Sequence, residues 1–177
     1  MFTPKQSIQG VFPIKVAVSG KGGVGKTSVA AYLARAWANV GFSVFAVDAD
    51  PDANLGWCLG FAPDVLASQQ PLSELQEVIR ERAGQGGLVV LNPAVSDIIA
   101  SQALEAHGVR LLRMGRIKPG GSGCYCPENS FLRAILAELL VREHDRVILD
   151  MSAGFEHLTR GTTRHVDLLL VVVEPSY

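Results

Sequence analysis

The sequence lacks any excess of basic charge. Its 177 residues carry 16 lysines and arginines against 17 aspartates and glutamates, which gives a formal net charge of −1. Nonspecific binding to nucleic acid depends on a positive field that neutralises phosphates, and membrane-surface binding commonly uses a basic amphipathic helix. The sequence shows neither feature, so we expect no nucleic-acid partner and no membrane partner.

Long apolar runs and cysteines are also scarce. No stretch approaches the roughly 18 apolar residues of a transmembrane helix, and the start, MFTPKQSIQG, has no apolar core of a secretory signal. Three cysteines are an odd number for a disulfide framework in a chain without an export signal. We therefore expect a soluble cytoplasmic protein, long enough to bury the core of one domain.

Strands and helices alternate along the sequence. Short apolar runs predict strands, and apolar residues at helical spacing predict helices. The expected strands are 14–19, 44–47, 88–91, 109–114, 146–149 and 168–173, and the expected helices are 27–40, 72–82, 97–106 and 131–141. Unbroken apolar strands linked by helices indicate a mostly parallel sheet with helices on both faces. The fold class is therefore α/β.

Residues 1–13 are interpreted as an N-terminal extension and residues 14–177 as the folded domain. The run 168–173, LLLVVV, is the most apolar predicted strand, and such a strand is expected in the interior of a sheet, with a neighbour on each side. The sequence stops four residues later. We therefore expect the domain to be truncated after this strand.

The stretch GKGGVGKT lies between the first predicted strand and the first predicted helix. It matches G-x-x-x-x-G-K-[ST], the P-loop of NTPases, whose glycines let backbone N–H groups converge on a phosphate at a helix N-terminus. Lys26 is expected to reach the β- and γ-phosphates of ATP, and the Thr27 hydroxyl to hold Mg²⁺. The predicted nucleotide-binding residues are Gly20, Lys21, Gly22, Gly23, Val24, Gly25, Lys26, Thr27 and Ser28.

Two groups of carboxylates follow predicted strands. Asp48, Asp50 and Asp52 lie at the carboxyl end of the second strand, where sheets of this kind bind ligands. Asp150 ends another apolar strand, which is the position of a Walker B aspartate that holds Mg²⁺ through water. The Ser-Ala-Gly sequence at 152–154 fits a switch sensitive to the γ-phosphate. Asp52 is equally well explained as a turn-forming residue.

Two of the three cysteines stand one residue apart, in GGSGCYCPEN. Pro127 suits the first position of the following helix, which makes Cys126 its N-cap, where the helix dipole stabilises a thiolate. In an extended segment Cys124 lies on the same side. Two thiolates are half of a tetrahedral ligand set, and a twofold dimer supplies the other half. We expect Ni²⁺, Zn²⁺ or an iron–sulfur cluster there; the alternative is a redox-active or accidental thiol pair.

The remaining metal-ligating side chains show no such pattern. Cys58, in GWCLG, is interpreted as a small packed residue. No spacing links the four histidines to the thiol pair, so none is assigned to a metal; they are His107, His144, His157 and His165.

Lys21 is an additional lysine directly after the first glycine of the P-loop, and by itself it could be a solvated loop residue. GKGGVGKT resembles the deviant Walker A motif of the MinD/ParA/nitrogenase-iron-protein group of dimeric ATPases. The resemblance implies that Lys21 reaches the partner's phosphates across a face-to-face dimer, as an arginine finger does. It also places Asp50 in switch I, where it positions the attacking water or the Mg²⁺ shell. The implied catalytic residues are Lys21, Lys26 and Asp50.

From about residue 14 onward the sequence resembles the CooC-type accessory ATPases of nickel carbon monoxide dehydrogenase. The resemblance rests on RMGRIKPGGSGCYCPENSFLRAIL and VILDMSAGFEHLTRGTTRHVDLLLVVVEPS, and the Cys-x-Cys-Pro-Glu-Asn stretch separates this family from MinD and ParA. It implies ATP hydrolysis coupled to nickel insertion, with carbon monoxide dehydrogenase as client. Cys124 and Cys126 would form a metal site, also open to Zn²⁺, at a homodimer interface. The family continues beyond Pro175.

Two other functions stay open. One is a nucleotide-gated reductase, in which the cysteines of a dimer hold an iron–sulfur cluster as nitrogenase iron proteins do. The other is a positioning ATPase of the MinD or ParA type that acts on DNA or membrane, which the near-neutral charge disfavours.

Overall fold

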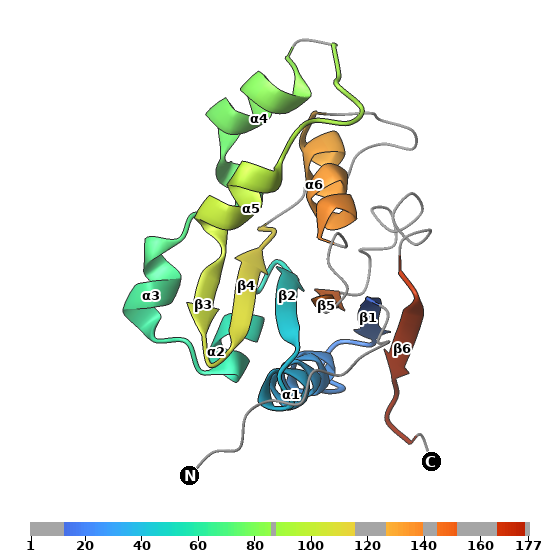
Figure 1. Ribbon diagram of the computed structural model, residues 1–177. Coiled ribbons are helices and arrows are strands. Elements are labelled where there is room, and N and C mark those ends of the chain that lie inside the picture. The colour runs from blue at the N-terminus through green and yellow to red at the C-terminus, as the bar shows by residue number, and fades with distance from the viewer. Residues whose placement is uncertain (1–12, 86–87, 116–126, 140–144, 152–165, 176–177) are drawn as a thin grey trace.

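The computed structural model describes residues 13–85, 88–115, 127–139, 145–151 and 166–175 (Figure 1). These residues form a six-stranded sheet in the order β3-β4-β2-β5-β1-β6. The strands are β1 (Ile14–Gly20), β2 (Ser43–Ala49), β3 (Leu104–Ala106), β4 (Val109–Arg113), β5 (Asp145–Met151) and β6 (Leu168–Val172). The helices are α1 (Lys26–Asn39), α2 (Leu55–Leu59), α3 (Pro63–Ser68), the 3₁₀ turn η1 (Leu72–Glu74), α4 (Gln76–Ala83), α5 (Ser96–Gln102) and α6 (Pro127–Glu138).

The sheet is parallel except at one edge. Strands β4, β2, β5, β1 and β6 pair in parallel, and β3 pairs antiparallel with β4 through a tight turn at His107 and Gly108. Parallel strands need crossover connections, and β1–α1–β2, which joins the strands on either side of β5, is the crossover that carries the phosphate loop. The predicted α/β class with a mostly parallel sheet is confirmed.

Helices cover both faces of the sheet, as Figure 1 shows for α1 and α2 on one side and α4 and α6 on the other. Successive strand residues alternate between two separate cores. Val16, Val18 and Ala46 pack with α1 and α2, whereas Ala17 and Val47 pack with α4, α5 and α6. Strand residues that face either side of the sheet are buried, which explains why the sequences of the central strands are continuous apolar runs.

Three predicted elements differ from the structure. The expected helix 72–82 is interrupted at Leu75, because the N–H of Ser73 donates to the Met114 carbonyl and ties the first turn to the end of β4. The expected strand 88–91 lies outside the sheet: the Val90 N–H donates to Ala83 O, and the Ser130 hydroxyl donates to Val90 O. The expected helix 97–106 ends at Gln102, and the last three residues of that range form β3.

Strand β6 lies at the edge of the sheet within the described residues, pairing with β1. Its apolar side chains are substantially exposed: Leu168 at 55%, Leu169 at 56% and Val171 at 56%. An edge position with exposed apolar side chains agrees with the expectation for this strand in the given sequence, and the truncation after β6 itself stays a prediction.

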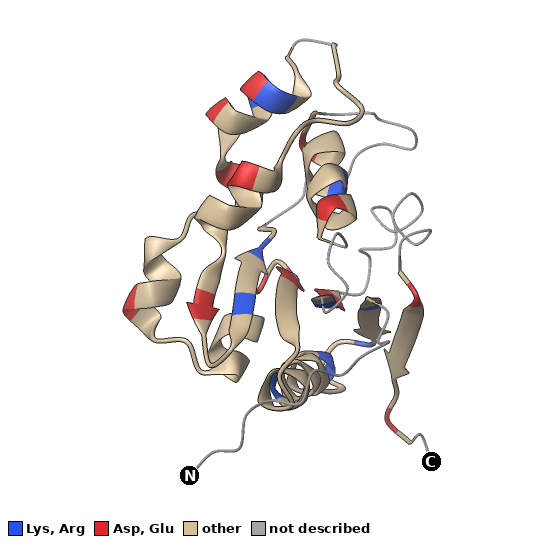
Figure 2. Cartoon of the chain, in the orientation of Figure 1, with Lys and Arg blue, Asp and Glu red and all other residues tan. Residues whose placement is uncertain are grey.

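Figure 2 shows that acidic and basic residues are distributed over the helices and strands of the described part of the chain. No helix among the described residues is long and apolar enough to span a membrane.

Candidate nucleotide site

The phosphate loop connects β1 to α1. Gly25 is the N-cap of α1 in the left-handed conformation, at φ 92°, and no side chain caps the first turn of the helix. The amide groups at this helix end are therefore left for an anion. A Cβ added at Gly22, Gly23 or Gly25 would meet no atom within 4 Å, so one side of the loop is open. The loop has the open, donor-rich form that a phosphate requires.

Gly20 closes the other side of the loop against β6. It has φ 145°, and a Cβ there would lie 2.3 Å from the carbonyl oxygen of Val172. Only glycine lets these two backbones approach so closely. The first glycine of the motif therefore serves sheet packing as well as loop conformation.

The two lysines of the loop have contrasting environments. Lys26 is 7% exposed, and its Nζ donates to the carbonyl oxygen of Lys21 at 3.0 Å. The Lys21 side chain is 82% exposed, with its Nζ 3.8 Å from Glu174 Oε1. Lys26 is thus held by its own loop, whereas the ammonium of Lys21 is open to a second molecule.

Asp150 ends β5 beside this loop and is fully buried. Neither of its carboxylate oxygens has a hydrogen-bond partner among the described residues. Burial raises the pKa of Asp150, and the charge of Asp50 adds to the rise, whereas the Thr27 hydroxyl and the Lys26 ammonium oppose it. Two buried, unpartnered oxygens next to a threonine hydroxyl suit a hydrated divalent cation, so the residues present fit Mg²⁺.

Asp48 faces the same side of the sheet but is fully engaged. It lies opposite Asp150 in the register of β2 with β5 and is also 0% exposed. Its Oδ2 accepts the Leu55 N–H at 3.0 Å and its Oδ1 accepts the Asp50 N–H at 3.3 Å. Burial raises the pKa of Asp48 to about 7, against the lowering effect of these two bonds and with small further rises from Asp150 and Asp50.

The turn that follows β2 is held by hydrogen bonds to Asp50. Its Oδ1 accepts the Asp52 N–H at 3.0 Å, and its carbonyl accepts the Ala53 N–H at 3.0 Å, with Ala53 left-handed at φ 49°. Asp52 is exposed and contributes its backbone N–H to this turn. The side chain that forms the turn is therefore that of Asp50, whereas Asp52 is exposed to solvent.

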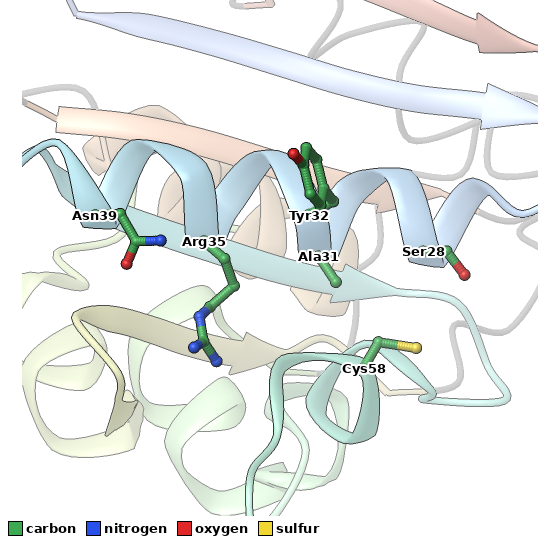
Figure 3. A pocket seen from close by; sticks show the side chains of 6 residues that line it. All are labelled: Ser28, Ala31, Tyr32, Arg35, Asn39 and Cys58. Carbon is green, nitrogen blue, oxygen red and sulfur yellow. The ribbon is translucent and has the colours of Figure 1, made fainter.

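Cys58 is exposed, so its interpretation as a packed residue is wrong. In the short helix α2 the buried side chains are Leu55 and Leu59, and Cys58 falls on the outer side of the turn. Its thiol borders a hollow of about 480 Å³ between α1 and α2 (Figure 3). The other lining residues are Ser28, Ala31, Tyr32, Arg35 and Asn39. The partial burial of the thiol raises its pKa, and the charges of Asp150 and Asp48 raise it further.

The expected thiol site lies outside the described residues. Cys124 and Cys126 fall in 116–126, and the predicted switch at 152–154 falls in 152–165. Helix α6 does begin at Pro127, as expected. In the described part of the chain, no three His, Cys, Asp or Glu side chains come together as a ready-made metal site.

Asp48 has a structural role that its position at a predicted strand end does not by itself reveal. Asp48 lies two and four positions after the inward-facing Ala46 and Val44, so strand alternation alone places its carboxyl in the buried layer. This alternation, which buries a carboxyl at a strand end, was the available signal, whereas the start of α2 seven residues later gave none.

Comparison with known proteins defines the class. The model of the CobQ/CobB/MinD/ParA nucleotide binding domain matches residues 15–173, so the chain belongs to this family of nucleotide-binding P-loop proteins. The MinC:MinD cell division complex of Aquifex aeolicus has the same fold, with a TM-score of 0.57 and 21% identity over 92% of this chain and 57% of that chain.

Among characterised relatives, the chain is similar to the carbon monoxide dehydrogenase accessory protein CooC of Rhodospirillum rubrum. The two are 43% identical over 167 residues, which cover 92% of this chain and 64% of that protein. An uncharacterised ATP-binding protein of Methanocaldococcus jannaschii is 40% identical over 92% of this chain and 64% of that protein. The expected resemblance to CooC-type proteins is confirmed, and the chain spans just under two thirds of these relatives' length.

Proposed function

We propose that the chain is the nucleotide-binding part of an ATP-dependent metallochaperone, which couples ATP hydrolysis to nickel insertion into carbon monoxide dehydrogenase. The observation that carries the proposal is the buried Asp150 carboxylate, with both oxygens unpartnered among the described residues, beside an open phosphate loop. That juxtaposition supports binding of a magnesium-complexed nucleoside triphosphate. The similarity to CooC supports the client and the metal.

Different residues of the chain bind the phosphates, hold Mg²⁺ and orient the attacking water. Backbone N–H groups of the loop and the start of α1 bind the β-phosphate, and the buried Lys26 ammonium moves from the Lys21 carbonyl to the β- and γ-phosphates. Thr27, Asp50 and Asp150 are the residues that would hold Mg²⁺. Bound there, Mg²⁺ would neutralise the charge that develops on the phosphates. Asp50, fixed by its own turn, orients the water that displaces ADP from the γ-phosphorus.

A second copy completes the site. The exposed Lys21 ammonium is proposed to reach the phosphates of the partner subunit, where it stabilises the transferring phosphoryl group. ATP therefore favours the dimer, and hydrolysis favours its relaxation.

Dimerisation also assembles the metal site. Cys124 and Cys126 of each subunit supply four thiolates on the twofold axis, suited to Ni²⁺ as cargo and also to Zn²⁺. Loss of the γ-phosphate changes the arrangement of the two subunits and therefore the affinity of the shared thiolate site for the metal ion. The protein is proposed to act in the cytoplasm on carbon monoxide dehydrogenase, with neither nucleic acid nor membrane as partner.

The proposal is tested by magnesium-dependent ATP hydrolysis. The matched comparison is Asp150→Asn, which removes a buried carboxylate, against Asp52→Asn, which changes an exposed one in the loop that follows β2 at the same end of the sheet. We expect Asp150→Asn to lower hydrolysis by about 100-fold and Asp52→Asn to leave it within about 2-fold. A wild-type chain without ATPase activity, or full activity in Asp150→Asn, would overturn the proposal.

A further inference from the structure

We propose that Asp48 is a positioning residue for ATP hydrolysis, which holds the segment that carries Asp50 through hydrogen bonds at both ends of it. The inference rests on the proposed function, since it assumes that Asp50 orients the attacking water. The segment runs from the end of β2 at Ala49 to the start of α2 at Leu55.

The first support is the way in which this segment is anchored. The N–H of Asp50 donates to Asp48 Oδ1 at its beginning, and the N–H of Leu55 donates to Asp48 Oδ2 at its end. Between these points, the described hydrogen bonds of the turn run from Asp52 and Ala53 back to Asp50. One buried carboxylate therefore fixes the two ends of the loop, and the loop folds around the residue proposed to orient water.

The second support is the start of α2. This helix has Asn54 as its N-cap, but no side-chain cap hydrogen bond is made there. Leu55, its first residue, is fully buried, and a buried N–H without an acceptor is costly. Asp48 supplies that acceptor from seven residues away, so it does for α2 what a capping side chain does locally.

The third support is the contrast between two opposed carboxylates. Asp48 and Asp150 are partners in the β2–β5 register and are equally buried. Both oxygens of Asp48 accept backbone N–H groups, whereas neither oxygen of Asp150 accepts a backbone N–H among the described residues, and the groups that act on it are the Thr27 hydroxyl and the Lys26 ammonium. Asp48 therefore has its lone pairs directed to the loop, and Asp150 has lone pairs left for a cation. Asp48 therefore positions the loop, and Asp150 is left to bind the cation.

The consequences for activity differ from those of a lost ligand. Asp48→Ala releases both ends of the loop but leaves the phosphate loop intact, so we expect kcat to fall by about 10- to 100-fold. The KM for ATP should change by less than about 3-fold, because Lys26 and the loop amides are untouched. Asp48→Asn keeps one carbonyl oxygen as an acceptor and should recover part of kcat.

The test combines kinetics with a direct readout of the loop in the same full chain. Steady-state hydrolysis is measured for wild type, Asp48→Ala, Asp48→Asn, Asp50→Asn and the Asp48→Ala/Asp50→Asn double variant. If Asp48 acts through Asp50, adding Asp48→Ala to Asp50→Asn should cause little further loss. Amide hydrogen exchange at Leu55, without nucleotide, should be at least about 10-fold faster in Asp48→Ala. Ile79→Val, in α4 on the other face of the sheet, controls for a general loss of stability.

The outcomes separate this inference from the proposed function. An active wild type with unchanged kcat in Asp48→Ala, additive losses in the double variant, or unchanged Leu55 exchange overturns the positioning role. Parallel losses in Asp48→Ala and Ile79→Val also overturn it, because they would reflect stability alone. A wild type that hydrolyses no ATP overturns the proposed function instead. The inference is supported by a kcat-specific loss, partial recovery in Asp48→Asn and faster Leu55 exchange.

Discussion

The ammonium of Lys26 donates a hydrogen bond to the backbone carbonyl of Lys21, 3.0 Å away, while the Lys21 side chain itself is 82% exposed. The loop thus uses the main chain of one lysine to hold the side chain of the other. Lys26 is kept within its own loop, whereas the Lys21 ammonium is exposed to solvent, with its described charge partner, Glu174, 3.8 Å away and exposed as well. This division is the structural basis for assigning one lysine to the subunit's own nucleotide and the other to its partner's.

A mixing experiment tests this assignment. Lys21→Ala and Asp50→Asn are each expected to be nearly inactive alone. When mixed, a heterodimer has one complete site, formed by Asp50 of the Lys21→Ala chain and Lys21 of the Asp50→Asn chain. About half of randomly paired dimers are mixed and each has one competent site of two, so ATPase activity should return to about a quarter of wild type.

The alternative gives a different result. If Lys21 served its own loop, neither site of the heterodimer would be complete, and the mixture would stay at the level of the single variants. Subunit exchange is checked separately by co-purification of differently tagged Lys21→Ala and Asp50→Asn chains, because a mixture that did not exchange would also stay at the level of the single variants.

A second prediction concerns the close approach of Gly20 to β6. Gly20→Ala places a Cβ against the Val172 carbonyl in a backbone conformation that alanine rarely adopts, so it should lower the free energy of unfolding by about 2 kcal/mol or more. Gly22→Ala, where the Cβ would meet open space, should change it by less than about 0.5 kcal/mol. Urea denaturation of both variants measures this difference, and equal stabilities would contradict the β1–β6 packing.

A third prediction uses the buried Lys15 at the opposite end of β1. Burial lowers the pKa of Lys15 from 10.5 to about 8, with the charge of Asp167 opposing the change. Its Nζ is buried without a hydrogen-bond partner among the described residues. Between pH 8 and 10.5 the unfolded chain therefore binds a proton that the folded chain has released. Below pH 8 both states are protonated, and the full cost of burying the charge is present.

Lys15→Met removes that cost while keeping the length of the side chain. It should stabilise the fold by at most about 3 kcal/mol at about pH 7, and the gain should shrink as pH rises through the window. Denaturation of wild type and variant at about pH 7 and about pH 10 measures the gain. Lys21→Met, at an exposed position, should show no such pH-dependent gain. A gain in Lys15→Met that is the same at both pH values would contradict the account.

The parts of the fold that followed from the sequence are those with strong local signals. The central strands were predictable because burial on both faces demands continuous apolar runs, and α1 because its apolar stripe follows a motif with a defined loop. The segment 88–91 has the same apolarity as a strand, but its backbone bonds to Ala83 and Ser130 instead of to a neighbouring strand. Apolarity alone could not reveal that competition.

The candidate site was predictable to a similar degree. Residues of the loop, Asp50 and Asp150 could be named because motif spacing places them at strand ends. The role of Asp48 and the exposure of Cys58 depend on α2, a helix of five residues. Helices this short have too few turns to show a period, and they form only through tertiary contacts such as the Asp48–Leu55 bond.

The central claim, a metal site shared by two chains under nucleotide control, is tested most directly by metal stoichiometry. Wild type and Cys124→Ser/Cys126→Ser are incubated with Ni²⁺ or Zn²⁺, with and without a non-hydrolysable ATP analogue, and bound metal per chain is measured after gel filtration. The account predicts about one metal ion per two chains in the wild-type dimer, a change in retained metal with the analogue, and loss of the ion in the double variant. Unchanged metal content in the double variant, or one ion per monomer, would contradict it.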